Sequence, residues 1–293
     1  MRKKKKISTG DSILDVFIYI CLIALTLLCL YPVWYVLAAS FADSTELSRN
    51  PGFLLWPEEF VSGAYALVFK NRLLMGGFKN TLTVLVCALP INIVLTLLCG
   101  YFMACPGMFW KKIIVGLIMF TMFFNGGLIP NYLNIRLLGL YNSLWALILP
   151  SALSVYNAII CKTAIEAIPD SLRESAYIDG ANDIQIIFKI IMPLIKPTLA
   201  VLLLYYGVGH WNSWFPASIY IRDNSLLPVQ NIIRSVLLAN QDLGGSGGGD
   251  DYNAYAETIQ YAAIVITTAP ILCIYPFLQK YFAKGAMIGA VKG

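Results

Sequence analysis

Few residues of this chain have the types and spacing that chemistry requires. Its seven cysteines lie inside apolar runs or near their ends, and none belongs to a Cys-x-x-Cys pair or to a cluster with histidine. His210 is the single histidine, and the sequence has no Gly-x-x-x-x-Gly-Lys-Ser/Thr motif for binding nucleotide phosphates. The sequence therefore predicts no catalytic residue and no metal site, and we interpret the cysteines as small apolar side chains within helices.

The composition places these residues in a membrane. Hydrophobic residues make up 58% of the 293 residues and charged residues only 13%, and the mean hydropathy is +0.70. Soluble domains carry about 25% charged residues, so a soluble globular fold is excluded. The net charge of +5 is no argument for nucleic-acid binding, because in a membrane protein the placement of the basic residues matters more than their sum.

Six apolar runs predict an all-α, polytopic membrane protein with six transmembrane helices. Each run is close to the roughly 20 residues that a helix needs to cross the hydrocarbon core, and the first is too long for the apolar core of a cleaved signal peptide. None contains Asp, Glu, Lys or Arg, which argues against an ion-coupled carrier. The third run is interrupted at Asn125-Gly126-Gly127. The predicted spans are residues 16–40, 80–110, 113–135, 144–161, 198–219 and 258–278.

The distribution of lysine and arginine predicts the orientation of these spans. With the amino terminus inside, two thirds of the 21 basic residues fall on the cytoplasmic side, so both termini are expected to be cytoplasmic. An outer glycine-rich segment at 244–249 is followed by Asp250 and Asp251, which would repel phosphate, and it is interpreted as a linker. The predicted parts are a cytosolic basic amino terminus (1–12), the transmembrane domain (13–279), its cytosolic loop (about 163–197) and a cytosolic tail (280–293).

The longest charged amphipathic segment, residues 169–197, lies between the fourth and fifth predicted spans. Asp170 or Ser171 is expected to cap a first helix, and Asn182 or Asp183 a second one. Gly180 is expected to form the elbow between the two helices, because glycine tolerates the left-handed conformation. Pro193 and Pro197 are expected to kink or end the second helix. Two short helices with an elbow make a docking surface for another protein; the alternative is an ordinary surface hairpin without a partner.

This segment resembles the EAA loop of ABC importer permeases, whose pattern is E-A-A, three residues, G, nine residues, I, one residue, L-P. Ser175 stands in place of the first alanine and Met192 in place of leucine. The six-span layout, the Trp211–Phe215 stretch and the carboxyl-terminal sequence are similar to the carbohydrate-uptake branch, including the maltose-permease G-subunit and lipoprotein/polysaccharide-type sugar permeases. The residues that carry the EAA resemblance are Glu174, Ser175, Ala176, Asp179, Gly180, Ala181, Phe188, Ile190, Pro193 and Pro197.

The resemblance implies a membrane subunit of an ATP-driven sugar importer in a bacterial inner or plasma membrane. It implies no cofactor in this chain, with ATP and Mg bound by two partner ATPase subunits, and it implies a second permease subunit, an extracytoplasmic sugar-binding protein and no nucleic-acid partner. The tail at 280–293 is either a frayed basic end or a segment that reaches between the ATPases. The residues expected to couple to the ATPases are Glu174, Ser175, Ala176, Asp179, Gly180, Ala181 and Pro193.

Polar and aromatic residues in the apolar runs could contact an oligosaccharide on its path, because aromatic faces stack on sugar C–H surfaces and amides hydrogen-bond hydroxyls. The structural alternative is interhelical hydrogen bonding and an interfacial aromatic belt, and both interpretations stay open. The residues concerned are Asn92, His210, Trp211, Asn212 and Trp214. Rival functions are an ABC permease for another solute, such as oligopeptides, and an ion-coupled carrier or membrane enzyme.

Overall fold

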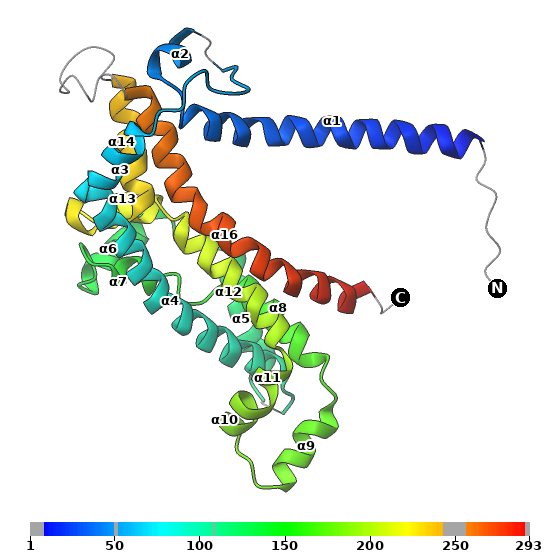
Figure 1. Cartoon of the computed structure of the whole chain (residues 1–293). Helices are drawn as coiled ribbons and strands as arrows, with labels where there is room; N and C mark the ends of the chain where they lie inside the picture. The colour runs from blue at the N-terminus through cyan, green and yellow to red at the C-terminus, as the bar shows by residue number, and fades with distance from the viewer. Residues whose placement is uncertain (1–8, 50–51, 108, 243–255, 291–293) are drawn as a thin grey trace. The chain divides into compact units, whose positions relative to one another are not determined.

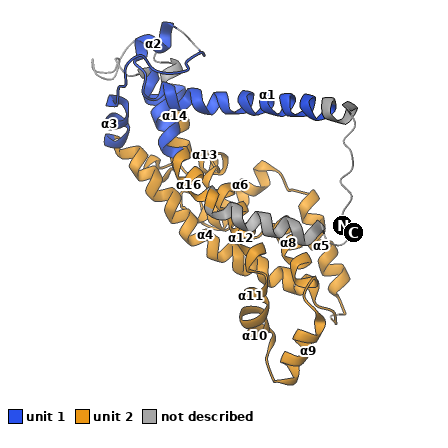
Figure 2. Cartoon of the chain, turned by 45° about the vertical axis from the view of Figure 1, so that its right-hand side comes forward, with its two compact units in different colours: residues 1–70, 236–267 blue, residues 71–235, 268–293 orange. Residues whose placement is uncertain are grey.

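The computed structural model of the chain describes residues 9–49, 52–107, 109–242 and 256–290 (Figure 1). Within these ranges every regular element is a helix, as the sequence predicts. The chain forms two compact units, Met1–Lys70 with Val236–Thr267, and Asn71–Ser235 with Thr268–Gly293 (Figure 2). The basic run at 2–6 and the glycine-rich segment at 244–249 lie outside the described residues.

The first unit contains α1 (Thr9–Ala39), α2 (Ser44–Arg49), α3 (Gly63–Lys70) and the beginning of α16 (Ala256–Ala290). Thr258 of α16 donates a hydrogen bond to the Ala42 carbonyl at 3.0 Å, and the rings of Tyr35 and Tyr261 meet edge to face at 5.7 Å. Most of α1 exposes large apolar side chains, and nothing in its most apolar stretch is buried within the chain. An apolar helix without a buried face suits contact with lipid.

The second unit is built on α4 (Arg72–Ala104), α8 (Val155–Glu166) and α12 (Lys196–Trp211). A Cβ at Gly100 would lie 2.9 Å from the Cys161 side chain, so the close approach of α4 and α8 requires glycine there. The other elements of this unit are α5 (Lys111–Phe123), α6 (Leu128–Leu137), α7 (Trp145–Ile148), α9 (Asp170–Ile178), α10 (Asp183–Gln185), the π-helix η1 (Ile186–Ile191), α11 (Met192–Leu194), α13 (Phe215–Tyr220), the 3₁₀-helix η2 (Asn224–Leu226) and the first half of α14 (Val229–Asp242).

Three described helices are long and apolar enough to cross a membrane: residues 14–39 of α1, the whole of α4, and residues 257–274 of α16. Two bent pairs add one span each if each pair is counted as one. They are α5 with α6, bent by 114°, and the 183–194 segment with α12, bent by 88°. By length and composition the described residues thus offer three to five spans, against the six that the apolar runs predict.

The differences lie where the chain interrupts its helices. The predicted break in the third span is confirmed, because α5 ends at Phe123 and α6 begins at Leu128. The predicted span at 144–161 is two helices, because the chain leaves the helical path around Pro150 and α8 begins only at Val155, capped by Ser154. The predicted span at 198–219 is also interrupted, because α12 ends at Trp211 and a turn separates it from α13.

Candidate functional site

The first helix of the 169–197 loop, α9, begins without a side-chain cap. Pro169 occupies the cap position and Asp170 is already helical. The expectation that Asp170 or Ser171 caps the helix is therefore wrong. Asp170 instead accepts a hydrogen bond from Arg173, one turn along α9. A carboxylate in the first turn of a helix is still favourable, because it faces the positive end of the helix dipole.

Gly180 forms the predicted elbow after α9. It has a φ of +78°, in the left-handed region. Its N–H donates to the Tyr177 carbonyl at 3.0 Å, and the Ala181 N–H donates to the Ala176 carbonyl at 2.9 Å. These two bonds define a Schellman motif, in which glycine takes the left-handed position after the helix. The elbow is therefore built by the backbone, and a side chain at Gly180 would meet open space.

Asn182 starts the second helix of the loop. Its side chain accepts from the Gln185 N–H at 2.9 Å, and the Gln185 side chain accepts from the Asn182 N–H at 3.1 Å, so Asn182 and not Asp183 is the cap. The helix widens into a π-helix over Ile186–Ile191 before Pro193. Chain direction then changes by 88° into α12, which carries Pro197 in its first turn. The expected proline-associated bend is confirmed.

A hydrogen-bonded clamp ties the loop to the end of α4. Tyr101 of α4 donates to the Asp183 carboxylate at 2.8 Å, and Tyr177 of α9 donates to the same oxygen. The two tyrosine hydroxyls lie 3.2 Å apart. The hydrogen bond to Asp183 raises the pKa of Tyr177, so the phenol stays a donor at neutral pH. One carboxylate thereby connects both helices of the loop with α4.

Cys105, just after α4, is a second point of attachment. The guanidinium of Arg173 donates to its sulfur at 2.9 Å, and Lys111 donates to its backbone carbonyl at 2.6 Å. Arg173 therefore folds back onto its own chain. Two side chains of α9, Arg173 and Tyr177, thus hold the helix against the end of α4.

The residues expected to couple to a partner divide into inward and outward ones. Ala176 is 6% exposed and packs with Ala181 in the chain's own core, so it does not face outward as a coupling residue would. The exposed residues of the expected set are Glu174, Ser175, Asp179, Gly180 and Pro193.

Large apolar side chains are exposed on the outward side of the loop. Ile178 is 86% exposed, Ile184 65%, and Leu172 43%. Exposed large apolar side chains on a short polar loop are typical of protein-binding surfaces. Figure 1 shows α9 and α10 at one end of the second unit, beyond the ends of α4 and α8. The helix thus exposes bulky apolar side chains, while Ala176, Arg173 and Tyr177 fix it to the rest of the chain.

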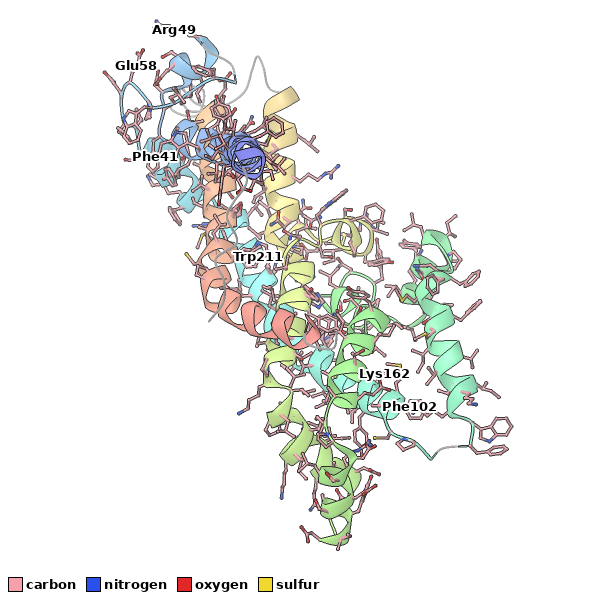
Figure 3. The ribbon with its side chains drawn as sticks, turned by 90° about the vertical axis from the view of Figure 1, so that its right-hand side faces the viewer. Phe41, Arg49, Glu58, Phe102, Lys162 and Trp211 are labelled. Carbon is pink, nitrogen blue, oxygen red and sulfur yellow. The ribbon has the colours of Figure 1, made fainter. Side chains whose placement is uncertain are left out.

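Three of the five predicted pathway residues have structural roles in this conformation. Asn92 is fully buried and donates to the Ser151 and Ala152 carbonyls at 2.8 and 2.9 Å. Its side-chain oxygen lies 3.0 Å from Nε2 of His210, and since an amide oxygen can only accept, His210 donates. Trp211, labelled in Figure 3, is 5% exposed and its ring lies 6.3 Å from that of Phe78.

The other two, Asn212 and Trp214, belong to the turn between α12 and α13. Asn212 is exposed and Trp214 is partly exposed. Asn231 of α14 donates to the Trp214 carbonyl at 2.9 Å, and the guanidinium carbon of Arg234 lies 3.7 Å from the centroid of the Trp214 ring. Sequence reasoning missed Arg234, which served only to predict orientation. Its position one turn after Asn231 on the same amphipathic helix was the available signal.

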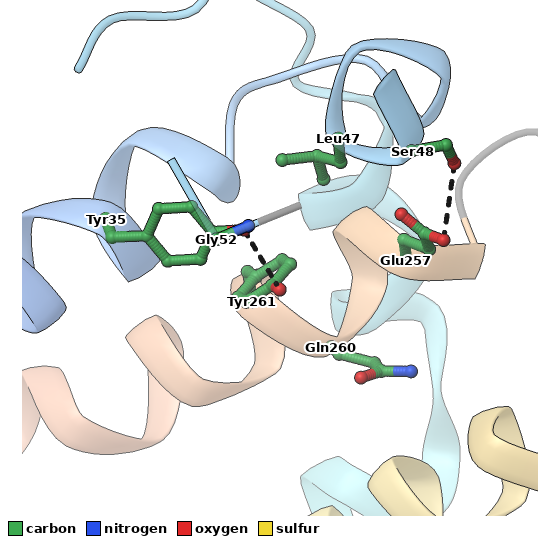
Figure 4. Close-up of a pocket in the computed structure, with 7 residues that line it drawn as sticks. All are labelled: Tyr35, Leu47, Ser48, Gly52, Glu257, Gln260 and Tyr261. Carbon is green, nitrogen blue, oxygen red and sulfur yellow. Dashed lines mark hydrogen bonds between the residues drawn. The ribbon is translucent and has the colours of Figure 1, made fainter. Parts of the chain in front are cut away.

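A cavity of about 450 Å³ lies in the first unit (Figure 4). Tyr35 accepts a hydrogen bond from the Gly52 N–H at 3.3 Å, and Ser48 donates to Glu257 at 3.3 Å. Gln260 and Tyr261 complete its polar wall. No sequence pattern singled out this cavity, since its lining comes from segments about 200 residues apart.

Chemistry on bound metal finds no support in the part of the chain that the structure describes, where His, Cys, Asp and Glu nowhere gather in threes. What the fold does define is an all-helical membrane protein with a projecting loop that suits docking on another protein. The functional class is therefore a transport or scaffold subunit that acts through partners.

Comparison with known proteins gives the family. The chain belongs to the family of binding-protein-dependent transport system inner membrane components, whose profile matches residues 80–287. It is 38% identical to the polygalacturonan/rhamnogalacturonan transport system permease protein YtcP of Bacillus subtilis (strain 168) over 97% of this chain and 99% of the relative. It is 39% identical to protein LplC of the same strain, over 89% of both chains.

A solved structure gives the same picture. A chain from the crystal structure of a bacterial ABC transporter involved in the import of the acidic polysaccharide alginate superposes with a TM-score of 0.87 at 28% identity, over 95% of this chain and 100% of that one. Family membership makes the chain a multi-pass inner-membrane transport subunit that works with a binding protein, and not an enzyme. This confirms the resemblance to importer permeases.

Proposed function

We propose that the chain is the permease subunit of an ATP-driven importer of oligosaccharides and forms half of its translocation pathway. Its relatives include permeases named for polygalacturonan and rhamnogalacturonan and for arabinooligosaccharides. The proposed complex holds a second, related permease, two ATPase subunits that bind ATP and Mg, and an extracytoplasmic sugar-binding protein. Both termini and the 169–197 loop face the cytoplasm.

The observation that carries this function is the two-sided construction of α9. Outward, Ile178 and Leu172 supply apolar surface for a groove on an ATPase subunit, where such side chains gain from burial. Inward, Tyr177 and Arg173 attach the helix to α4 through Asp183 and Cys105. A helix so attached transmits the displacement of whatever docks on it to a membrane-spanning helix.

In the proposed transport cycle this chain changes conformation but makes and breaks no covalent bond. Closure of the two ATPase subunits brings α9 and its counterpart on the second permease together. The clamp at Asp183 passes that displacement to α4. The 88° bend before α12 allows the loop to move in a different direction from α12. The pathway changes from inward to outward opening, and a loaded binding protein delivers the sugar.

Gly180 offers the test. ATP hydrolysis by the complete complex, stimulated by sugar-loaded binding protein, is measured for wild type, Gly180→Ala and Gly180→Arg. Both variants strain the left-handed position by about 1–2 kcal/mol, but alanine adds no bulk. We expect Gly180→Ala to keep most of the stimulation and Gly180→Arg to lose at least tenfold, because arginine places a long cationic side chain on the docking surface.

As a control, all subunits must co-purify with each variant at wild-type ratios. Otherwise the loss of ATPase stimulation reflects failed assembly of the complex. If Gly180→Arg keeps full stimulation and uptake, the loop is a passive hairpin and the proposed coupling is wrong.

A further inference from the structure

The accessible part of the predicted pathway is small. Asn92 and His210 are hydrogen-bonded to each other, and Asn92 and Trp211 are buried. None of the three is therefore available to cargo in this conformation. Asn212 and Trp214 are, at the turn that follows α12. A side chain that packs on the 212–214 turn therefore lies where a sugar can contact the chain.

Arg234 is such a group. Its guanidinium carbon Cζ lies 3.7 Å from the centroid of the Trp214 ring, well inside the roughly 6 Å range of a cation–π contact. Asn231, one turn earlier on α14, holds the Trp214 backbone. The side-chain oxygen of Asn231 is buried without a hydrogen-bond partner, so this junction retains an unused acceptor.

No carboxylate within the described ranges neutralises Arg234. The ion pairs found there are Lys162 with Glu166 and Arg173 with Asp170, both in other parts of the second unit. Arg234 is exposed, and a cation–π contact supplies no carboxylate to its guanidinium, which has five N–H donors. A stacked and unpaired arginine is therefore oriented in advance for a bidentate contact with a carboxylate.

We propose that Trp214 and Arg234 form a subsite for the carboxylate of a uronic acid unit, so that the oligosaccharide cargo is acidic. The inference deepens the proposed function and rests on it. Arg234 binds the carboxylate, the exposed amide of Asn212 is available for hydroxyls, and Phe215, which is 49% exposed and edge-on to Trp214 at 5.5 Å, adds aromatic surface for the sugar ring.

The cavity in the first unit does not serve this cargo equally well. Glu257 lines it, and a carboxylate in its wall repels a uronate. The names of two similar proteins agree with an acidic cargo, since one refers to polygalacturonan and the other to alginate. In this chain itself, the feature that favours an acidic cargo is the exposed Arg234 beside Trp214.

The test compares two cargoes with the same sugar skeleton, the charged trigalacturonate and its neutral methyl ester. Uptake of each is measured in proteoliposomes that hold the complete complex and an unchanged binding protein, for wild type, Arg234→Gln, Arg234→Lys and Arg136→Gln. Because the binding protein is the same throughout, its own preference cancels in the ratio of variant to wild type for each cargo.

We expect Arg234→Gln to lower trigalacturonate uptake about tenfold, the size of one lost charge-assisted hydrogen bond, and ester uptake less than about twofold. Arg234→Lys is expected between wild type and Arg234→Gln, because lysine keeps the charge but not the planar fork. Arg136 is the matched control: it is exposed, its guanidinium lies 5.6 and 5.8 Å from the Tyr141 and Tyr132 rings, and Arg136→Gln should leave both cargoes unchanged.

Other outcomes overturn the inference. Equal loss for both cargoes would mean that Arg234 contacts the binding protein or the fold, and equal loss in Arg136→Gln would mean a general effect of surface charge. A wild-type complex that imports neutral oligosaccharides and rejects trigalacturonate contradicts the acidic cargo but leaves the proposed function standing. A complex that imports no oligosaccharide contradicts the proposed function itself.

Discussion

The two ends of α12 differ in the side chains that they expose. Before it, the 169–197 loop exposes Ile178 and Ile184, while Tyr177 and Arg173 bind residues of the chain's own bundle. At its other end, Trp211 is buried and the turn that follows exposes the side-chain amide of Asn212. Arg234 lies against the ring of Trp214. Exposed apolar surface suits a protein partner that stays bound. Polar and aromatic groups suit a hydrophilic cargo that binds transiently, because water can solvate them when no cargo is bound.

The largest effect is expected where an exposed apolar side chain becomes charged. Ile178→Asp would place a carboxylate in the proposed ATPase contact, which removes about 1.5–3 kcal/mol of apolar burial and adds a desolvation cost. We expect the ATPase subunits to bind at least tenfold more weakly, measured by co-purification at graded dilution. Thermal unfolding of the variant should match wild type, because Ile178 is 86% exposed.

Glu174→Gln, on the same helix and also exposed, serves as the control and should change ATPase binding less than about twofold. Normal co-purification of Ile178→Asp would show that this side of α9 is not the contact.

Asn92→Ala tests the assignment of a buried amide to structure rather than to cargo. The change leaves the Ser151 and Ala152 carbonyls and His210 without a partner, so the free energy of unfolding should fall by about 1–3 kcal/mol. Thermal unfolding in detergent measures it. If stability is unchanged and the ratio of acidic to esterified cargo shifts, Asn92 belongs to the pathway.

Tyr177→Phe and Tyr101→Phe test the clamp at Asp183. Each removes one hydrogen bond to a carboxylate, worth about 1.5–3 kcal/mol. We expect the complex to assemble and hydrolyse ATP while sugar uptake per ATP falls a few-fold. Since both hydroxyls share one acceptor, the double variant should lose less than the two single losses together; strict additivity would argue against a shared clamp.

The smallest effect is expected at Cys105. Cys105→Ala removes the sulfur that accepts from Arg173, but Arg173 keeps Asp170 and Lys111 keeps the backbone carbonyl. Sulfur is a weak acceptor, so uptake should change less than about twofold and unfolding by under about 1 kcal/mol. A loss comparable to that of Tyr177→Phe would place Cys105 in the clamp.

Local chemistry explains which features the sequence predicts. The elbow at Gly180, the Asn182 cap and the break at Asn125-Gly126-Gly127 depend on residues within a few positions of one another, and the structure has all three. The composition alone shows that the chain is a membrane protein. The cap at Asp170 or Ser171 was predicted wrongly, because Asp170 is already helical and its carboxylate accepts from Arg173 instead.

Contacts between distant residues could not be predicted. Asn92 and His210 are 118 residues apart, and their pairing depends on where α4 and α12 cross. The inward position of Ala176 depends on which side of α9 meets the bundle, and an amphipathic pattern does not choose between a partner and the chain's own core. Arg234 and Trp214 meet because α14 returns across the turn after α12.

From the close contact between Gly100 and Cys161 we infer that α4 acts as a rigid lever that pivots there. Its short arm runs to Tyr101 and Cys105, which carry the 169–197 loop, and its long arm runs back to Gly77, where a Cβ would lie 3.0 Å from the Val229 backbone at the start of α14. At 1.5 Å per residue the long arm measures about 35 Å, so a tilt of about 10° about the fulcrum moves its tip by roughly 6 Å. Small displacements at the loop are thereby amplified at the helix that bears Arg234.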